Sequence, residues 1–329
     1  MKIIKQILSV LLKAFISIFL LWYLFRQVDK QKLLETVIHA DKLLLTAAFC
    51  LFSFTYTVCL FRWKMLLDAI KIDIPLRRVI ASFSGGIFFN QILPSSIGGD
   101  LVRSIDLASH TKKAKEVVAT VFLDRLSGYI GLVVMSLLSL ACGWKLIHDK
   151  TVLYVVLAIS GLLGLILLVL FNKYTFSKVN SLLRSPKSGK FREAITGIHQ
   201  QIHVFRDKKS TAIKNILYSL GVQILGATSF YVIARSVGVD IKMIYFFIFV
   251  PIMGVVTLLP ISIGGLGVRE NIAAYLFPLV GVPKDLAIAM SLLNFSFILI
   301  CAVTGGLIYY VYTVRHRRLQ SSQSSAAGR

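Results

Sequence analysis

Two arginines in apolar surroundings are the residues of this 329-residue chain whose spacing points most clearly to chemistry. Arg103 and Arg269 each end an eleven-residue segment, Leu93–Arg103 and Leu259–Arg269, and eight of the eleven positions are identical without a gap. Each segment contains a proline and a glycine pair, which interrupt helices. Because guanidinium groups suit phosphate and an intramembrane arginine is costly, both are candidates for binding an anion.

The residues around the arginines strengthen this prediction. A half-helix that begins after a glycine pair directs unpaired N–H groups at an anion, and glycine lets a ligand approach the backbone closely. We therefore predict a lipid-headgroup site at the centre of the molecule, made by Pro94, Ser96, Gly98, Gly99, Asp100, Arg103, Asp124, Arg125, Pro260, Ser262, Gly264, Gly265, Arg269 and Glu270. A purely structural alternative is that the Pro-Gly turns let two hairpins pack while the arginines extend to the membrane surfaces.

Asp124 and Arg125 are a charged pair inside an apolar run. The pair either lines the cavity and offers Arg125 to a phosphate, or its charges satisfy each other or a neighbouring helix. Met290 and Ser291 occupy the equivalent places in the second copy, so the predicted site is asymmetric.

Two further polar pairs have competing interpretations. The amides of Asn90 and Gln91 either bond headgroup hydroxyls or cap exposed backbone at the helix break, and we favour the second. His199 and His203 have a spacing that suits a metal, but their apolar neighbours follow helical spacing, which indicates an amphipathic helix on the membrane surface. We expect no metal, no cofactor and no catalytic residue, since no phosphate-binding loop or nucleophile elbow is found.

The composition requires that these residues be carried by membrane helices. Hydrophobic residues make up 56% of the chain and charged residues 16%, against about 25% charged in soluble proteins. The apolar residues form long runs, which excludes a soluble enzyme, a disordered chain and a disulfide scaffold. The net charge of +22 resides largely in loops, as cytoplasmic loops of membrane proteins require, so we expect no nucleic-acid partner.

The charge of the loops predicts the orientation. We expect an all-α polytopic membrane protein with six full spans, near residues 7–25, 43–61, 117–140, 152–171, 213–234 and 285–312. Two other apolar runs, 79–97 and 243–263, end in Pro and Gly. If 79–97 crossed fully, the segment 173–209, with nine basic and two acidic residues, would face outside, against the positive-inside rule. Both broken runs are therefore predicted to be re-entrant hairpins, with both termini in the cytoplasm.

The repeat organises the whole chain. The offset of 166 residues carries the span at 43–61 onto 209–227, and the two spans cross in opposite directions. Inverted repeats with broken helices are typical of transporters. We therefore predict a transmembrane domain over 1–314, with repeats at about 41–172 and 207–314, and a disordered polar cytoplasmic tail over 315–329.

At these residues the chain resembles a known family. Phe89–Arg103 is similar to the first signature of the flippase-like membrane domain of lysylphosphatidylglycerol synthases, and Leu259–Glu270 to the second. The resemblance covers roughly residues 5–315 and implies a stand-alone member that moves lipid across the bacterial cytoplasmic (inner) membrane. In that family an acidic–arginine pair, commonly with Glu, occupies the place of Asp124 and Arg125. Few residues follow Tyr312, so we do not expect the cytosolic synthase domain or its lysyl-transfer activity.

Three hypotheses follow. The first is a flippase-like transporter of an anionic lipid, of phospholipid or polyprenyl-phosphate type. The second is a membrane enzyme acting on a lipid-linked phosphate or sugar, with Asp100, Asp124 and Glu270 as its bases. The third is a scaffold for a lipid-biosynthesis enzyme. The sequence leaves the oligomeric state open.

Overall fold

A computed structural model describes the chain at residues 15–16, 18–20, 22–23, 26, 30–93, 98–111, 113–142, 150–171, 208–257, 262 and 264–327. Within these ranges the elements are helices, and no strand occurs there. The helices are α2 (Lys30–Ile38), α3 (Lys42–Ala69), α4 (Leu76–Ile92), α5 (Gly98–Ala108), α6 (Ala114–Cys142), α7 (Lys150–Phe171), α10 (Lys209–Ser236), α11 (Ile244–Val256), α12 (Val268–Leu276), the 3-10 turn η2 (Phe277–Val280) and α13 (Lys284–Ala327).

Four of the described helices are long and apolar enough to cross a membrane: α3, α6, α10 and the part of α13 up to Thr313. They coincide with four of the six predicted spans. The predicted span at 152–171 forms α7, a helix of 22 residues. Most of the span predicted at 7–25, and all of the predicted surface helix with His199 and His203, lie outside the described residues.

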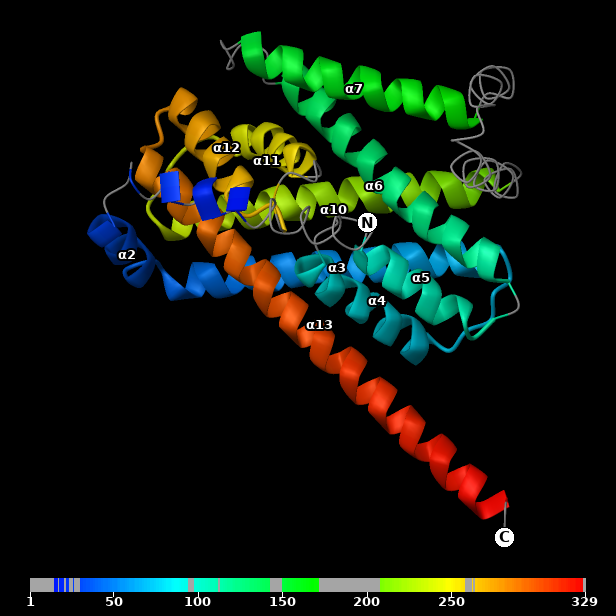
Figure 1. Ribbon diagram of the computed structural model, residues 1–329. Coiled ribbons are helices and arrows are strands. Elements are labelled where there is room, and N and C mark those ends of the chain that lie inside the picture. The colour runs from blue at the N-terminus through cyan, green and yellow to red at the C-terminus, as the bar shows by residue number, and fades with distance from the viewer. Residues whose placement is uncertain are drawn as a thin grey trace.

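The order of elements repeats. A long helix, two short helices and a second long helix occur as α3, α4, α5 and α6, and again as α10, α11, α12 and α13 (Figure 1). We call α4 with α5 hairpin one, and α11 with α12 hairpin two. In both copies the break between the short helices falls on the repeated Pro-Gly motif.

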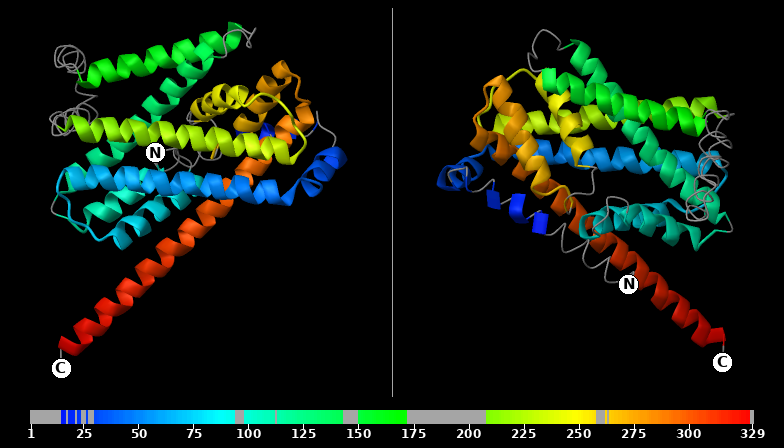
Figure 2. Two further views of the ribbon diagram at one scale, coloured as in Figure 1. Left: turned by 180° about the vertical axis from the view of Figure 1, so that it is seen from behind. Right: turned by 45° about the horizontal axis from the view of Figure 1, so that its top comes forward.

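The first helices of the two repeats lie side by side and run antiparallel (Figures 1 and 2). The backbone N–H of Asp41, just before α3, donates to the carbonyl of Ser236 at the end of α10, at 2.9 Å. Further along, the Ser229 hydroxyl donates to the Ala48 carbonyl at 2.8 Å. Equivalent helices of the two repeats therefore point in opposite directions, as an inverted repeat requires.

One helix of each hairpin packs against a long helix of the opposite repeat. Hairpin one packs through α4 against α13, and hairpin two packs through α11 against α6. Small residues make the first contact very close: a Cβ on Gly305 would lie 2.7 Å from the Ser84 carbonyl oxygen, and one on Gly85 would lie 2.7 Å from the Tyr309 ring. Each repeat thus completes the packing of the other.

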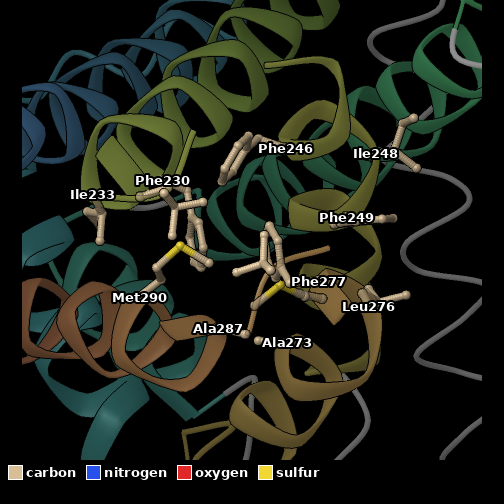
Figure 3. Packing of buried hydrophobic residues seen from close by; sticks show 14 of the residues in the cluster. Phe230, Ile233, Phe246, Ile248, Phe249, Ala273, Leu276, Phe277, Ala287 and Met290 are labelled. Carbon is tan, nitrogen blue, oxygen red and sulfur yellow. The ribbon is translucent and has the colours of Figure 1, made fainter. Parts of the chain in front are cut away.

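Hairpin two is surrounded by an apolar core (Figure 3). Phe230 of α10 and Phe277 after α12 stack with ring centroids 5.8 Å apart, and Phe249 of α11 meets Phe277 edge-on at 5.4 Å. Met290 of α13 is fully buried in the same cluster. Aromatic rings in these geometries add to the stabilisation that comes from burial alone.

The last helix is longer than predicted. The tail 315–329, expected to be disordered, continues α13 as far as Ala327, and this helix projects beyond the bundle (Figure 1). Between Leu307 and Ala327 the chain has no proline or glycine to end the helix.

Candidate functional site

Five charged side chains from three helices form an ion-pair network inside the protein. Arg103 of α5 places Nη2 3.0 Å from Asp124 Oδ2 on α6, and its Nε lies 3.0 Å from Asp100 Oδ1. Asp124 Oδ1 accepts from Arg62 Nε of α3 at 2.8 Å. Asp100 also pairs with Arg125 of α6. The carboxylates are thus shared between guanidinium groups.

The network carries one more positive than negative charge, since it contains three guanidinium groups and two carboxylates. Four of the five side chains are buried, and the Arg125 side chain is 27% exposed. The Arg103 guanidinium also lies 4.7 Å from the centre of the Trp63 ring, where a cation–π contact is favourable. Packing therefore fixes Arg103 and leaves Arg125 the most accessible cation.

A cavity of about 290 Å³ adjoins this network. Its walls come from α3, α4, α5, α6 and α10, and its volume far exceeds the roughly 10–15 Å³ that one water needs. The lining residues are Tyr56, Cys59, Arg62, Phe83, Gly86, Ile87, Asn90, Asp100, Arg103, Asp124, Arg125, Gly128, Tyr129, Leu132, Val222 and Gln223. The cavity is large enough for a small anionic group to reach the arginines.

Local sequence explains how hairpin one presents its charges. Asp100 and Arg103 are three residues apart on α5 and so share one face. Asn90 Oδ1 accepts from the Gly99 N–H at 2.9 Å, which confirms the predicted capping role of this amide. A Cβ on Gly99 would overlap the Gly86 carbonyl oxygen. In this hairpin the glycine therefore serves close packing of α5 on α4, and its N–H is satisfied by the protein.

Hairpin two has the same motif but a different set of contacts. Gly264, Gly265 and Gly267 have φ angles of +60°, +76° and +83°, a region that glycine adopts without strain. The Gly267 N–H donates to Glu270 Oε2 at 2.6 Å and caps α12. Glu270 is fully buried, and its other oxygen accepts from the Ser291 hydroxyl at 3.2 Å.

Arg269 has weaker partners than Arg103. Its Nη2 donates to the Gly264 carbonyl at 3.3 Å, and its Nε lies 3.6 Å from Glu270 Oε1. Among the described residues neither Arg269 Nε nor the buried Ser262 hydroxyl has a hydrogen-bond partner. The Arg269 guanidinium lies 5.0 Å from the Phe295 ring. Because this site in hairpin two pairs one arginine, Arg269, with one carboxylate, Glu270, it carries no excess charge.

The structure brings together part of the predicted site. Asp100, Arg103, Asp124 and Arg125 line the cavity, whereas the predicted residues of hairpin two that the structure describes are not among its described lining residues. The hairpins nevertheless meet: a Cβ on Gly264 would lie 2.8 Å from Gln91 Oε1 at the end of α4. Gly98 packs against the Leu93 side chain. The remaining predicted residues, Pro94, Ser96 and Pro260, lie outside the described residues.

Arg62 is the network residue that the sequence interpretation missed. The span predicted at 43–61 ends one residue before it, but α3 continues to Ala69, and Arg62 pairs with Asp124 of α6. Its Nη1 donates to the Ser219 hydroxyl of α10 at 3.0 Å. The apolar residues that follow, among them Leu66 and Leu67, were a signal that the helix had not ended at position 61.

Comparison with known proteins places the chain among membrane proteins of one family. Residues 10–306 match the model of the lysylphosphatidylglycerol synthase TM region. The chain is 25% identical over 319 residues to UPF0104 membrane protein PH1989 of Pyrococcus horikoshii, covering 88% of this chain and 92% of that protein. It is 28% identical over 273 residues to a UPF0104 membrane protein of Methanothermobacter thermautotrophicus, covering 76% and 78%. The chain is a polytopic membrane protein and belongs to the lysylphosphatidylglycerol synthase TM region family.

Proposed function

We propose that this protein binds an anionic lipid by its headgroup and moves it across the membrane. The observation that carries the proposal is the cavity beside a buried network with one excess positive charge. An uncompensated charge among membrane helices costs at least about 2.5–3.5 kcal/mol. A phosphate in the cavity would neutralise it, and Arg125 is the guanidinium best placed to make the first contact.

The arrangement of the helices supports transport over simple binding. In transporters with inverted repeats, the substrate site lies between broken helices, and one repeat rocks against the other. Here the two hairpins act as re-entrant elements that enter from opposite faces, and their tips touch where Gln91 meets Gly264. Arg269 of hairpin two is proposed as a second contact for the headgroup, because its Nε has no hydrogen-bond partner among the described residues. Both termini lie in the cytoplasm, and the membrane is the bacterial cytoplasmic (inner) membrane.

The contacts of the carboxylates favour a transporter over an enzyme. A general base needs an oxygen that is free to accept a proton from substrate. Asp124 and Asp100 each pair with two arginines, and Glu270 holds the Gly267 N–H and the Ser291 hydroxyl. We propose no lysyl transfer and no other catalytic step.

The experiment is a headgroup-exposure assay with purified protein in proteoliposomes. Phospholipids with a labelled headgroup are incorporated, and loss of label to a membrane-impermeant reagent is followed with time. Arg125→Gln removes the accessible cation, and Arg235→Gln removes an exposed arginine of α10 that pairs with Asp240 outside the cavity. Wild type and Arg235→Gln should exchange lipid rapidly, and Arg125→Gln at least tenfold more slowly, because one charge-assisted hydrogen bond contributes about 1.5–3 kcal/mol.

Three results would count against the proposal. Equal exchange by Arg125→Gln and wild type would leave a transporter whose site lies elsewhere. Absence of exchange with both phospholipids and polyprenyl phosphates would refute translocation. Turnover of a lipid-linked substrate that Asp100→Asn or Asp124→Asn abolishes would establish the enzyme hypothesis instead.

A further inference from the structure

Gln223 is a polar side chain of the cavity that neither the ion-pair network nor the helix packing uses. It lies midway along α10, between Val222 and the lipid-facing Ile224. It is half-buried and lines the cavity together with Arg125 and Asp124. An amide at this depth is costly unless it is hydrogen-bonded.

The neighbouring polar residues on the same face of α10 are all used by the protein. Asn215, Ser219 and Gln223 are spaced four residues apart and so form one stripe. Asn215 Nδ2 donates to the Arg62 carbonyl at 3.5 Å, and the Ser219 hydroxyl accepts from Arg62. In the part of the chain that the structure describes, no hydrogen bond involves the Gln223 amide. The stripe therefore ends in an amide that lines the cavity and has no hydrogen-bond partner among the described residues.

An amide recognises different chemistry from a guanidinium group. It carries no charge, and it can donate and accept at the same time, which is what a hydroxyl group needs. The arginines supply the positive charge for a phosphate, so Gln223 adds nothing essential for that group. It adds a contact for a neutral hydroxyl attached to the phosphate. A phosphate monoester has no such attached group.

We infer that Gln223 is a specificity-determining residue that selects phosphodiester lipids with a hydroxyl-bearing headgroup. This inference rests on the proposed function. The excess of one positive charge in the network fits the single negative charge of a phosphodiester. The cavity of about 290 Å³ has room for the phosphate together with a small polyol. The ligand class is therefore a lipid phosphodiester of glycerol, inositol or a sugar, in preference to a lipid phosphomonoester.

The test uses two lipids with the same charge and nearly the same headgroup size. Phosphatidylglycerol carries two headgroup hydroxyls, and phosphatidylpropanol carries none. We measure equilibrium binding of short-chain fluorescent forms of both to the purified full-length protein, and exchange of both in proteoliposomes. Wild type should prefer phosphatidylglycerol about fivefold to tenfold, since one hydrogen bond contributes about 1–1.5 kcal/mol.

The variants are Gln223→Leu, which removes the amide, Gln223→Asn, which keeps a shorter amide, and Ile224→Leu as a control on the lipid-facing side of α10. Gln223→Leu should bind both lipids equally, with the affinity for phosphatidylpropanol unchanged. Gln223→Asn should keep part of the preference, and Ile224→Leu should keep all of it. Unchanged affinity for phosphatidylpropanol also shows that Gln223→Leu is folded.

The outcomes separate this inference from the proposed function. If neither lipid is exchanged but the binding preference depends on Gln223, translocation of phospholipids is refuted and the selectivity stands. If exchange occurs without preference, or Gln223→Leu keeps the preference, the selectivity is refuted and translocation stands. Glycerophosphoglycerol, which is the same headgroup without acyl chains, should displace the labelled lipid only at millimolar concentration. Displacement at micromolar concentration would assign the site to a soluble phosphodiester and overturn the lipid class.

Discussion

Hairpin one and hairpin two have nearly the same break in their sequence, yet they are held in different ways. Arg103 of hairpin one enters a network of charges on α3 and α6, whereas hairpin two is embedded among aromatic rings (Figure 3). The position of α13 that corresponds to Asp124 is Met290, which is buried in the apolar cluster. The motif thus interrupts the helix in both repeats, and the long helices decide which hairpin carries the excess charge.

The largest difference between the hairpins should appear when their buried carboxylates are neutralised. Asp124→Asn leaves Arg62 and Arg103 without their shared counter-charge, which should destabilise the fold by about 3–5 kcal/mol. Glu270→Gln keeps an oxygen for the Gly267 N–H and removes the counter-charge of one arginine, Arg269, at the longer distance of 3.6 Å, so it should cost less, about 1.5–3 kcal/mol. Thermal unfolding of both variants in one detergent measures the difference. Similar losses in melting temperature would mean that the network is not what holds hairpin one.

Glycine substitutions test the backbone of each hairpin. Gly99→Ala forces a methyl group onto the Gly86 carbonyl, so we expect a loss of about 1–3 kcal/mol together with loss of lipid exchange, because α5 and Arg103 must shift. Gly265→Ala meets an unfavourable positive φ of +76°, which costs about 1–2 kcal/mol. Lipid exchange per folded molecule should therefore be faster in Gly265→Ala than in Gly99→Ala. The reverse order would assign the moving, functional break to hairpin two.

The smallest effect is expected in the aromatic core. Phe277→Leu keeps an apolar side chain of moderate size and should destabilise by about 1 kcal/mol. Lipid exchange per folded molecule should equal that of wild type, because this core lies apart from the cavity lining. Tyr275→Leu, at an exposed position of α12, serves as the control for the substitution. Slower exchange by folded Phe277→Leu would place the aromatic core in the path of the lipid.

Sequence patterns were sufficient to predict the long helices of both repeats and the breaks between the short helices. The Pro-Gly motifs marked both interruptions, and the apolar runs marked α3, α6, α10 and α13. Asp124 was identifiable because a carboxylate inside an apolar run needs a partner. These features follow from local sequence alone.

The pairings across helices could not be predicted in the same way. The partnership of Arg62 with Asp124 depends on how α3 rotates against α6, which periodicity does not specify. Gln223 could not be predicted as a site residue, because a single amide in a membrane helix forms no spacing pattern with other residues. The glycine at position 99 was interpreted as a point of ligand approach, whereas the space beside it is filled by α4.

The packing of α4 against α13 has a consequence for synthesis. The close seam of α4 forms with α13, which leaves the ribosome after hairpin one. At synthesis rates of about 5–20 residues per second, the stretch between Ile92 and Lys284 takes roughly 10–40 s to make. Throughout that interval hairpin one has no cover for its small-residue face. The nascent chain must therefore be sheltered by lipid or by the insertion machinery until α13 arrives.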